Sequence, residues 1–132
     1  METQAAPQRV LIVDDAPIVR EALRWIFSEA TDVNVVGEAS NGREALAYVS
    51  QLQPDVVILD VELPDLDGYT VARSIKALPH APIVLFLSVH SDAMARYQAM
   101  AAGGDSFIEK GVGWLPLIQE IRRLISQRQA GQ

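Results

Sequence analysis

The apolar residues of this chain follow two spacings that alternate along its length. Short runs rich in Val, Ile and Leu are too brief for typical helices, and the continuously apolar ones are typical of strands buried on both faces. These runs predict strands at residues 9–13, 33–39, 55–59 and 82–87, with a weaker one at 105–108.

Between these runs, apolar residues recur at the spacing of one helical face. The first such stripe, at i, i+3, i+4, i+7 and i+8, consists of Val19, Ala22, Leu23, Ile26 and Phe27. Similar stripes recur within residues 45–52, 71–75 and 117–125. Residues 94–102 have a helical composition but only a thin apolar stripe. The sequence therefore predicts five helices, one after each strand.

Alternating strands and helices indicate a single α/β domain. Parallel strands joined by helices form right-handed βαβ units, and the helices then cover both faces of the sheet. We therefore expect a doubly wound sheet of five parallel strands with five helices. The residues after 126 are polar, so we expect a frayed tail there.

Composition restricts the classes of function. The chain has 132 residues, which is enough for one domain with a substantial core. It has no cysteine, which excludes disulfides and thiolate chemistry, and its formal net charge of −6 argues against general binding of nucleic acid. No apolar run approaches the ~18–20 residues of a membrane span, and residues 1–8 lack the apolar core of a signal peptide. We expect a cytoplasmic protein.

Polar residues follow four of the five predicted strands. Asp14 and Asp15 come after the first strand, Asp60 after the third, Ser88 after the fourth and Lys110 after the fifth. In a parallel sheet the carboxyl ends of the strands share one edge, which is where such folds bind ligands. We therefore expect these five side chains to lie near one another.

The chemistry of this set favours phosphoryl transfer. Three crowded carboxylates repel one another, and a hard divalent cation such as Mg²⁺ relieves that repulsion with oxygen ligands. A lysine and a hydroxyl can bind phosphoryl oxygens, and a carboxylate can itself act as the nucleophile and form an acyl phosphate. The alternative for any single strand-end Asp is a helix cap, and only the complete set favours function.

The same residues, in the same order, resemble the receiver domains of response regulators. The motifs are Asp14-Asp15, Asp60 before Pro64 and Asp67-Gly68, Leu87-Ser88-Val89-His90, and Phe107-Ile108-Glu109-Lys110. The resemblance covers residues 9–128, with residues 1–8 expected as a flexible N-terminus and 129–132 as a tail. It implies a flavodoxin-like sheet with strand order 2-1-3-4-5. The local sequence around Ser88 and Lys110-Gly111 is most similar to that of the NarL/FixJ subfamily, whose members usually carry a DNA-binding domain after the receiver.

The resemblance implies a role for each motif residue. Asp60 is expected to accept a phosphoryl group from a histidine kinase, while Ser88 and Lys110 contact that group. Mg²⁺ is expected to bind Asp15, Asp60 and the main-chain carbonyl of Glu62, with Asp14 acting mainly through a metal-bound water. Phe107 matches an aromatic switch position that moves inward when Ser88 is pulled toward the phosphate, although simple core packing explains this residue equally well.

The implied function is a signalling switch and not an enzyme, apart from self-catalysed phosphoryl transfer and slow autodephosphorylation. The expected output is control of a partner or an effector domain in transcription regulation, and the domain itself binds neither nucleic acid nor membrane. A homodimer is expected on the face formed by the fourth helix, fifth strand and fifth helix. The alternative within the family is a stand-alone receiver that acts through protein–protein contacts.

A rival from another class is an Asp-nucleophile phosphatase of the haloacid dehalogenase type. Such enzymes typically have a second Asp two residues after the nucleophile, where this chain has Glu62. Their nucleophile also usually follows the first motif strand, whereas Asp60 follows the third. In receivers, the positions of Glu62 and His90 tune the lifetime of the phosphoryl group. The chain departs from many receivers at Gly111, where they have a proline, and at Val89, where they have Ala or Gly.

Overall fold

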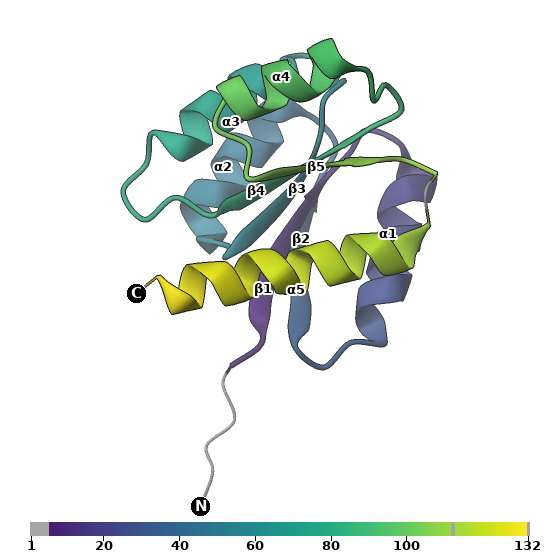
Figure 1. Ribbon diagram of the computed structural model, residues 1–132, viewed down its shortest axis with the longest axis vertical. Helices are drawn as coiled ribbons and strands as arrows, with labels where there is room; N and C mark the ends of the chain where they lie inside the picture. Colours follow the sequence, from purple (N-terminus) through teal and green to yellow (C-terminus); the bar gives the residue numbers. More distant parts are fainter. Residues whose placement is uncertain (1–5, 112, 132) are drawn as a thin grey trace, which may run out of the picture.

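The computed structural model describes residues 6–111 and 113–131. Strands and helices alternate strictly along this part of the chain (Figure 1). The strands are β1 (Gln8–Val13), β2 (Val33–Ala39), β3 (Val56–Asp60), β4 (Ile83–Ser88) and β5 (Ser106–Glu109). The helices are α1 (Pro17–Ser28), α2 (Gly42–Leu52), α3 (Gly68–Lys76), α4 (Ala93–Ala101) and α5 (Trp114–Ala130).

The five strands form one parallel sheet in the order β2-β1-β3-β4-β5. This confirms the doubly wound, flavodoxin-like architecture. The order places β1 and β3 side by side, with Val13 opposite Leu59 near their carboxyl ends. It also places β4 between β3 and β5, so that Asp60 pairs with Leu87 and Ser88 pairs with Glu109. The reversal of strand order between β1 and β3 is the switch point at which this class of sheet binds ligands.

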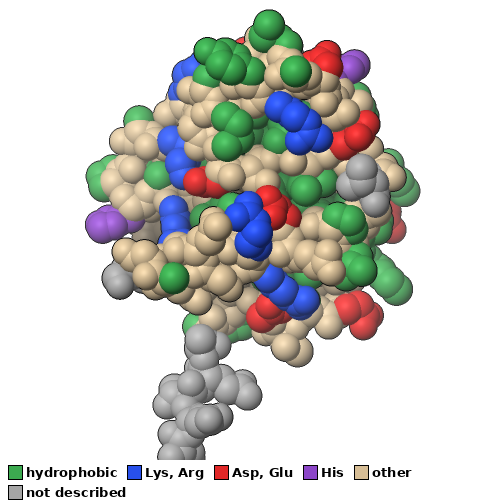
Figure 2. All heavy atoms as spheres, viewed as in Figure 1, with side chains coloured by type: hydrophobic (Ala, Val, Ile, Leu, Met, Phe, Trp, Pro, Cys, Tyr) green, Lys and Arg blue, Asp and Glu red, His purple; other side chains and the backbone are tan. Residues whose placement is uncertain are grey.

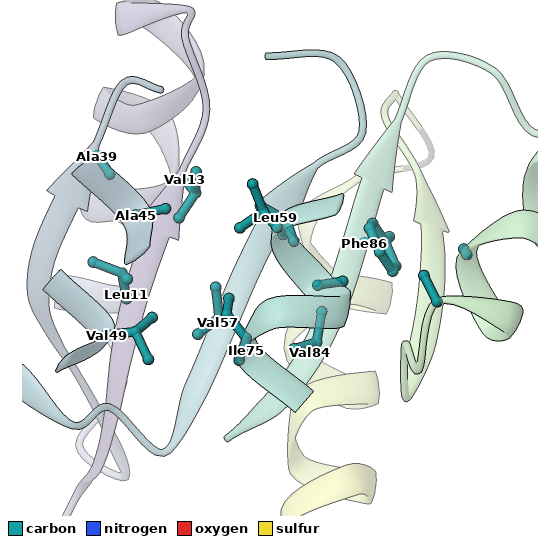
Figure 3. Packing of buried hydrophobic residues seen from close by; sticks show 14 of the residues in the cluster. Leu11, Val13, Ala39, Ala45, Val49, Val57, Leu59, Ile75, Val84 and Phe86 are labelled. Carbon is teal, nitrogen blue, oxygen red and sulfur yellow. The ribbon is translucent and has the colours of Figure 1, made fainter. Parts of the chain in front are cut away.

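Two apolar layers sandwich the sheet because successive side chains of a strand point to opposite faces. Val10 and Ile12 pack with α1 and α5 on one face, while Leu11 and Val13 pack with α2, α3 and α4 on the other. Figure 3 shows the second layer, in which Ile75 of α3 lies near the side chains of β3 and β4. All residues of β3 and β4 are buried, as the continuously apolar runs predicted.

Side-chain caps fix where the helices begin on the carboxyl side of the sheet. The side-chain oxygens of Asn41, Asp67 and Asp92 accept hydrogen bonds from backbone N–H groups in the first turns of α2, α3 and α4. The carboxylate of Asp65 additionally accepts hydrogen bonds from the N–H groups of Gly42 and Arg43, at 2.7 and 3.0 Å. The loop that follows β3 is therefore anchored to the start of α2.

Gly68 allows α3 to begin directly against β3. A Cβ atom at this position would lie 2.3 Å from the backbone oxygen of Asp60, far inside van der Waals contact. The N–H of Gly68 also donates a 2.7 Å hydrogen bond to the carbonyl of Val61. Only glycine fits this close approach, which holds the loop after Asp60 in a fixed path.

Helix α4 has the reverse of the usual amphipathic arrangement. Its buried residues are the small Ala95 and Ala99, whereas Met94, Tyr97 and Met100 are 64%, 71% and 51% exposed. Figure 2 shows the resulting group of hydrophobic side chains over α4, at the top of the view. The thin apolar stripe in the sequence thus reflects a helix that contacts the sheet mainly through methyl groups.

Several boundaries differ from the sequence-based expectation. Strands β3, β4 and β5 begin and end one residue later, so Asp60 and Ser88 are the last residues of their strands. Helix α5 continues to Ala130, through the region expected to be a frayed tail. Gln8 belongs to β1, and residues 1–5 of the expected N-terminal segment and 132 of the expected tail lie outside the described residues. No helix within 6–111 and 113–131 has the length and apolarity needed to cross a bilayer.

Candidate functional site

The parallel register gathers the strand-end residues at one edge of the sheet. Backbone hydrogen bonds continue beyond the strands, from the N–H of Asp14 to the carbonyl of Ala39 at 3.1 Å and from the N–H of Lys110 to the carbonyl of Ser88 at 2.7 Å. Asp14 directly follows β1 and Asp60 ends the adjacent strand β3, while Ser88 lies next to the start of the β5–α5 loop. The edge combines acidic, hydroxyl and basic groups on a rigid support.

Three carboxylates form a compact cluster at this edge. One oxygen from each of Asp14, Asp15 and Asp60 can be chosen so that all three lie within 4.8 Å of one another. Asp14 and Asp60 are buried, whereas Asp15 is exposed. A hard divalent cation fits this donor set, because all three groups are anionic oxygen ligands and the exposed member opens the site to water and ligand.

Lys110 neutralises part of the cluster. Its Nζ lies 2.8 Å from Oδ2 of Asp14 and 3.1 Å from Oδ2 of Asp60. The other oxygen of Asp14 accepts a 2.9 Å hydrogen bond from the N–H of Ala16, and Arg20 donates a 2.6 Å hydrogen bond to the backbone carbonyl of Asp14. The buried Asp14 side chain is thus held in one orientation, and Lys110 joins it to Asp60.

The electrostatics make Asp60 an unusual carboxyl group. Burial raises the pKa of Asp60 above its ordinary value, and the negative charge of Asp14 raises it further. The hydrogen bond from Glu62 N–H and the positive charge of Lys110 oppose this rise without cancelling it. Burial alone lowers the pKa of Lys110, but its close contact with Asp14 and the charges of Asp60 and Asp14 outweigh that effect and raise it. An additional cation beside Asp60 would therefore favour its ionised, nucleophilic form.

The loops after β3 and β4 meet above this edge through a contact that sequence reasoning missed. Nε2 of His90 lies 3.0 Å from Oε1 of Glu62, and both side chains are largely exposed. The backbone N–H of His90 also donates a 3.0 Å hydrogen bond to Oγ of Ser88, which is buried. The signal in the sequence was positional, since Glu62 and His90 each come two residues after the last residue of neighbouring strands.

Phe107 lies apart from the carboxylates, within the apolar layer under α4. It is 8% exposed and pairs with Phe86 in the sheet register. The guanidinium carbon of Arg96 in α4 lies 4.9 Å from the centroid of the Phe107 ring. The ring is thus directed inward, and two residues, Ile108 and Glu109, separate it from Lys110 along the chain.

Comparison with known proteins gives the class of molecule. The family model described as the response regulator receiver domain matches residues 10–122, and the chain belongs to this family. It is a receiver domain of the two-component response regulator type. The predicted resemblance is therefore confirmed at the level of the family.

The names of individual relatives indicate different functions. The chain is 40% identical over 118 residues to a protein-glutamate methylesterase/protein-glutamine glutaminase from Symbiobacterium thermophilum. This alignment covers 89% of this chain and 33% of that protein. It is 32% identical over 120 residues to the Fimbriae Z protein of Salmonella typhimurium, covering 91% of this chain and 57% of the relative. The chain spans about a third of the length of the methylesterase relative.

A solved structure agrees with the subfamily resemblance. The receiver domain of the putative response regulator NarL from Mycobacterium tuberculosis superposes with a TM-score of 0.86 at 32% identity, covering 91% of this chain and 97% of that one. The response regulator domain of Thermotoga maritima CheB also superposes, with a TM-score of 0.76 at 32% identity, covering 94% of this chain and 96% of that one. The architecture alone therefore does not specify the output.

Proposed function

We propose that Asp60 is the phosphoryl acceptor of this receiver domain. The observation that carries the proposal is the position of a buried Asp60 carboxylate, 3.1 Å from the Lys110 ammonium and within one cluster with Asp14 and Asp15. A nucleophilic carboxylate needs cations around it, because phosphoryl transfer brings further negative charge to the site.

The reaction is an in-line displacement at phosphorus. An oxygen of Asp60 attacks the phosphorus of a phosphohistidine in a sensor histidine kinase, the P–N bond breaks, and its electron pair leaves with the imidazole, which takes up a proton. The product is an acyl phosphate on Asp60. Lys110 pairs with a phosphoryl oxygen, and the hydroxyl of Ser88 donates a hydrogen bond to another.

The acidic cluster fits Mg²⁺ as the cofactor of this step. Asp15, Asp60 and the main-chain carbonyl of Glu62 would hold the ion, and Asp14 would act through a metal-bound water. The bound ion would supply charge neutralisation for the incoming phosphoryl group. Asp14 has a second role in this chain, because its 2.8 Å contact with Lys110 holds that ammonium beside Asp60.

The conformational output follows from the new charge. An acyl phosphate adds charge and acceptor oxygens, and in this proposal Ser88 and Lys110 move toward them, which displaces the β4–α4 loop and the start of the β5–α5 loop. Helix α4 follows Ser88 and packs on the sheet mainly through alanines, so it is the element best suited to shift. Phe107 is the proposed aromatic switch between the two loops.

We propose that the exposed face of α4, β5 and α5 transmits this change in a cytoplasmic protein. Met94, Tyr97 and Met100 provide an apolar surface that a partner, an effector domain or a second copy can cover. Transcription regulation through a DNA-binding domain is the favoured output, supported by the similarity to the NarL receiver. In this proposal the receiver spans residues 9–128 and binds neither nucleic acid nor membrane itself.

The relatives named as methylesterases support a second candidate output. In that case the receiver would control an attached protein-glutamate methylesterase domain, because the chain matches only a third of such a relative's length. The receiver would still be a non-enzymatic regulatory module. The reading frame beyond Gln132 distinguishes the two outputs, since one continues into a helix-turn-helix domain and the other into a hydrolase domain.

Intact-mass measurement with acetyl phosphate tests the acceptor. With Mg²⁺ the wild-type chain is expected to gain one phosphoryl group, and Asp60→Asn is expected to gain none. Asp92→Asn is the matched control, because Asn caps α4 as well as Asp does and leaves the acidic cluster intact. Labelling that survives Asp60→Asn would move the acceptor elsewhere, and labelling that persists after chelation of Mg²⁺ would refute the metal assignment.

A further inference from the structure

Within residues 6–111 and 113–131, Arg96 is the only residue whose charged side chain lies over an aromatic ring. Its guanidinium carbon is 4.9 Å from the centroid of the Phe107 ring, within the distance of a cation–π contact. Planar guanidinium groups are well suited to such stacking because they are more weakly hydrated than ammonium groups. Arg96 thus covers a ring that would otherwise border solvent.

The small residues of α4 explain why this cover matters. Ala95 and Ala99 share the apolar layer with Phe107 and Phe86, but each offers only a methyl group to the rings. Phe107 also has no hydroxyl with which to fix its position by a hydrogen bond. The long side chain of Arg96 therefore supplies contact that the buried face of α4 lacks.

Arg96 is connected to the loop that follows Ser88. Its Nε donates a 3.2 Å hydrogen bond to the backbone carbonyl of Ser91. In the same loop the N–H of His90 donates to Oγ of Ser88. A continuous set of contacts therefore runs from Ser88 through His90 and Ser91 to Arg96 and the ring of Phe107.

We propose that Arg96 is a positioning residue that holds the Phe107 ring inward and joins the ring to the β4–α4 loop. A displacement of that loop changes the carbonyl that Arg96 binds, and Arg96 transmits the change to the ring. Loss of Arg96 frees the ring to turn outward and separates it from Ser88. The role in holding the ring stands on the geometry alone, whereas the role in signalling rests on the proposed function.

Fluorine NMR tests the first part directly. The chain contains three phenylalanines, Phe27, Phe86 and Phe107, so 4-fluorophenylalanine gives three resonances that single Phe→Leu variants assign. In Arg96→Met we expect the Phe107 resonance to move and its shift between H₂O and D₂O to increase, because the ring gains solvent contact. Arg96→Lys should restore part of the wild-type signal, since an ammonium keeps the charge but lacks the planar stack.

The controls separate positioning from general loosening. Arg73→Met removes an exposed arginine from α3 and should leave all three resonances unchanged. Phe27 and Phe86 should stay in place in Arg96→Met. An unchanged Phe107 resonance in Arg96→Met would overturn the proposal, as would equal movement of all three rings.

A titration with beryllofluoride and Mg²⁺, followed by the same resonances, tests the second part. If the inward ring favours the activated state, Arg96→Met should need about two- to fivefold more beryllofluoride for half-saturation, the change that one exposed cation–π contact can produce. An unchanged midpoint would refute the coupling to Ser88. Absence of any wild-type response would instead count against the proposed function, while the resonances without beryllofluoride would still decide whether Arg96 holds the ring.

Discussion

Helices α3 and α4 have the same length and lie on the same face of the sheet, yet they are attached to it in different ways. Each has nine residues, and each begins after an Asp whose carboxylate caps the first turn. Helix α3 buries Val71, Ala72 and Ile75, whereas α4 buries only Ala95 and Ala99. Burial of branched side chains removes far more apolar area from water than burial of methyl groups, so α3 is held more strongly.

The difference matches the parts of the site that the two helices follow. Helix α3 follows the loop after Asp60, the proposed acceptor, which must keep its geometry for chemistry. Helix α4 follows the loop after Ser88, which is proposed to respond to the new charge. Within the described part of the chain, the only hydrogen bond between the two helices is long: the hydroxyl of Tyr69 donates to the carbonyl of Ala95 at 3.4 Å. Two helices of equal length thus differ in how much apolar side chain attaches them to the sheet, which suits the proposed roles of α3 as a fixed support and of α4 as a movable element.

The largest expected effect comes from shortening a buried side chain of α3. Ile75→Ala should lower the free energy of unfolding by about 2–5 kcal/mol, because Ile75 is fully buried and its loss leaves a cavity. Met100→Ala in α4 should change it by less than about 0.5 kcal/mol, because this side chain is half exposed. Urea denaturation of the two variants measures both values. Similar losses in the two variants would remove the basis of the comparison.

The next effect concerns the start of α3. Gly68→Ala should lower the free energy of unfolding by about 1–3 kcal/mol, because the new Cβ meets the backbone of Asp60 and not a side chain that can move. It should also slow labelling by acetyl phosphate, since Asp60 is displaced. Ala93→Ser, at the exposed start of α4, is the control and should be nearly silent. Normal labelling rates in Gly68→Ala would show that the close approach is unnecessary for the acceptor.

Asp60→Asn should stabilise the metal-free protein by about 1 kcal/mol, because it removes a charge from a buried site beside Asp14. A carboxyl group whose pKa is raised in the folded state stabilises that state while protonated and ceases to do so as pH rises through the folded pKa. The pKa of an ordinary Asp carboxyl is 3.8, and that of Asp60 in the folded protein is higher. The difference in unfolding free energy between Asp60→Asn and the wild type should therefore grow as the pH rises from 4 toward neutrality. Thermal melts across this pH range measure it. A wild-type protein that is more stable than Asp60→Asn at neutral pH without metal would contradict this electrostatic account.

An effect of similar size is expected from loss of either of the two helix caps. Asp67→Ala and Asp92→Ala each remove one hydrogen bond worth about 1 kcal/mol to the helix that it caps. Because α4 contributes less to the folded state, Asp92→Ala should speed hydrogen exchange within α4 while changing global unfolding less than Asp67→Ala does. Hydrogen exchange measured separately for each helix gives both the exchange rate within α4 and the free energy of global unfolding. Wild-type α4 amides protected as strongly as those of α3 would argue against a movable α4.

The sequence could predict the sheet and the gathering of its strand-end residues, because both depend on local spacing and on a general property of parallel sheets. Asp14, Asp15, Asp60 and Lys110 were placed at one edge on that argument, and the structure brings them into contact. Their chemical roles stay predictions. Strands β3 and β4 end one residue later than predicted because the polar Asp60 and Ser88 continue the backbone ladder.

Contacts between separate elements could not be read from spacing. The pairing of His90 with Glu62 and the position of Arg96 over Phe107 depend on how two loops and a helix pack, which periodicity does not encode. The helical spacing also does not predict the environment of Trp25, which lies off the main apolar stripe of α1 and is 69% exposed. The extent of α5 was underestimated because its last turns are polar and are held by the continuity of the helix.

The full burial of β3 and β4 has a consequence for how this domain can diverge. Every residue of these strands is buried, so a substitution there acts first on the stability of the fold. Met94, Tyr97 and Met100 project from α4 into solvent and add little to folding. Substitutions at these three residues can therefore change the surface offered to partners while leaving the buried strands and the proposed phosphorylation site intact.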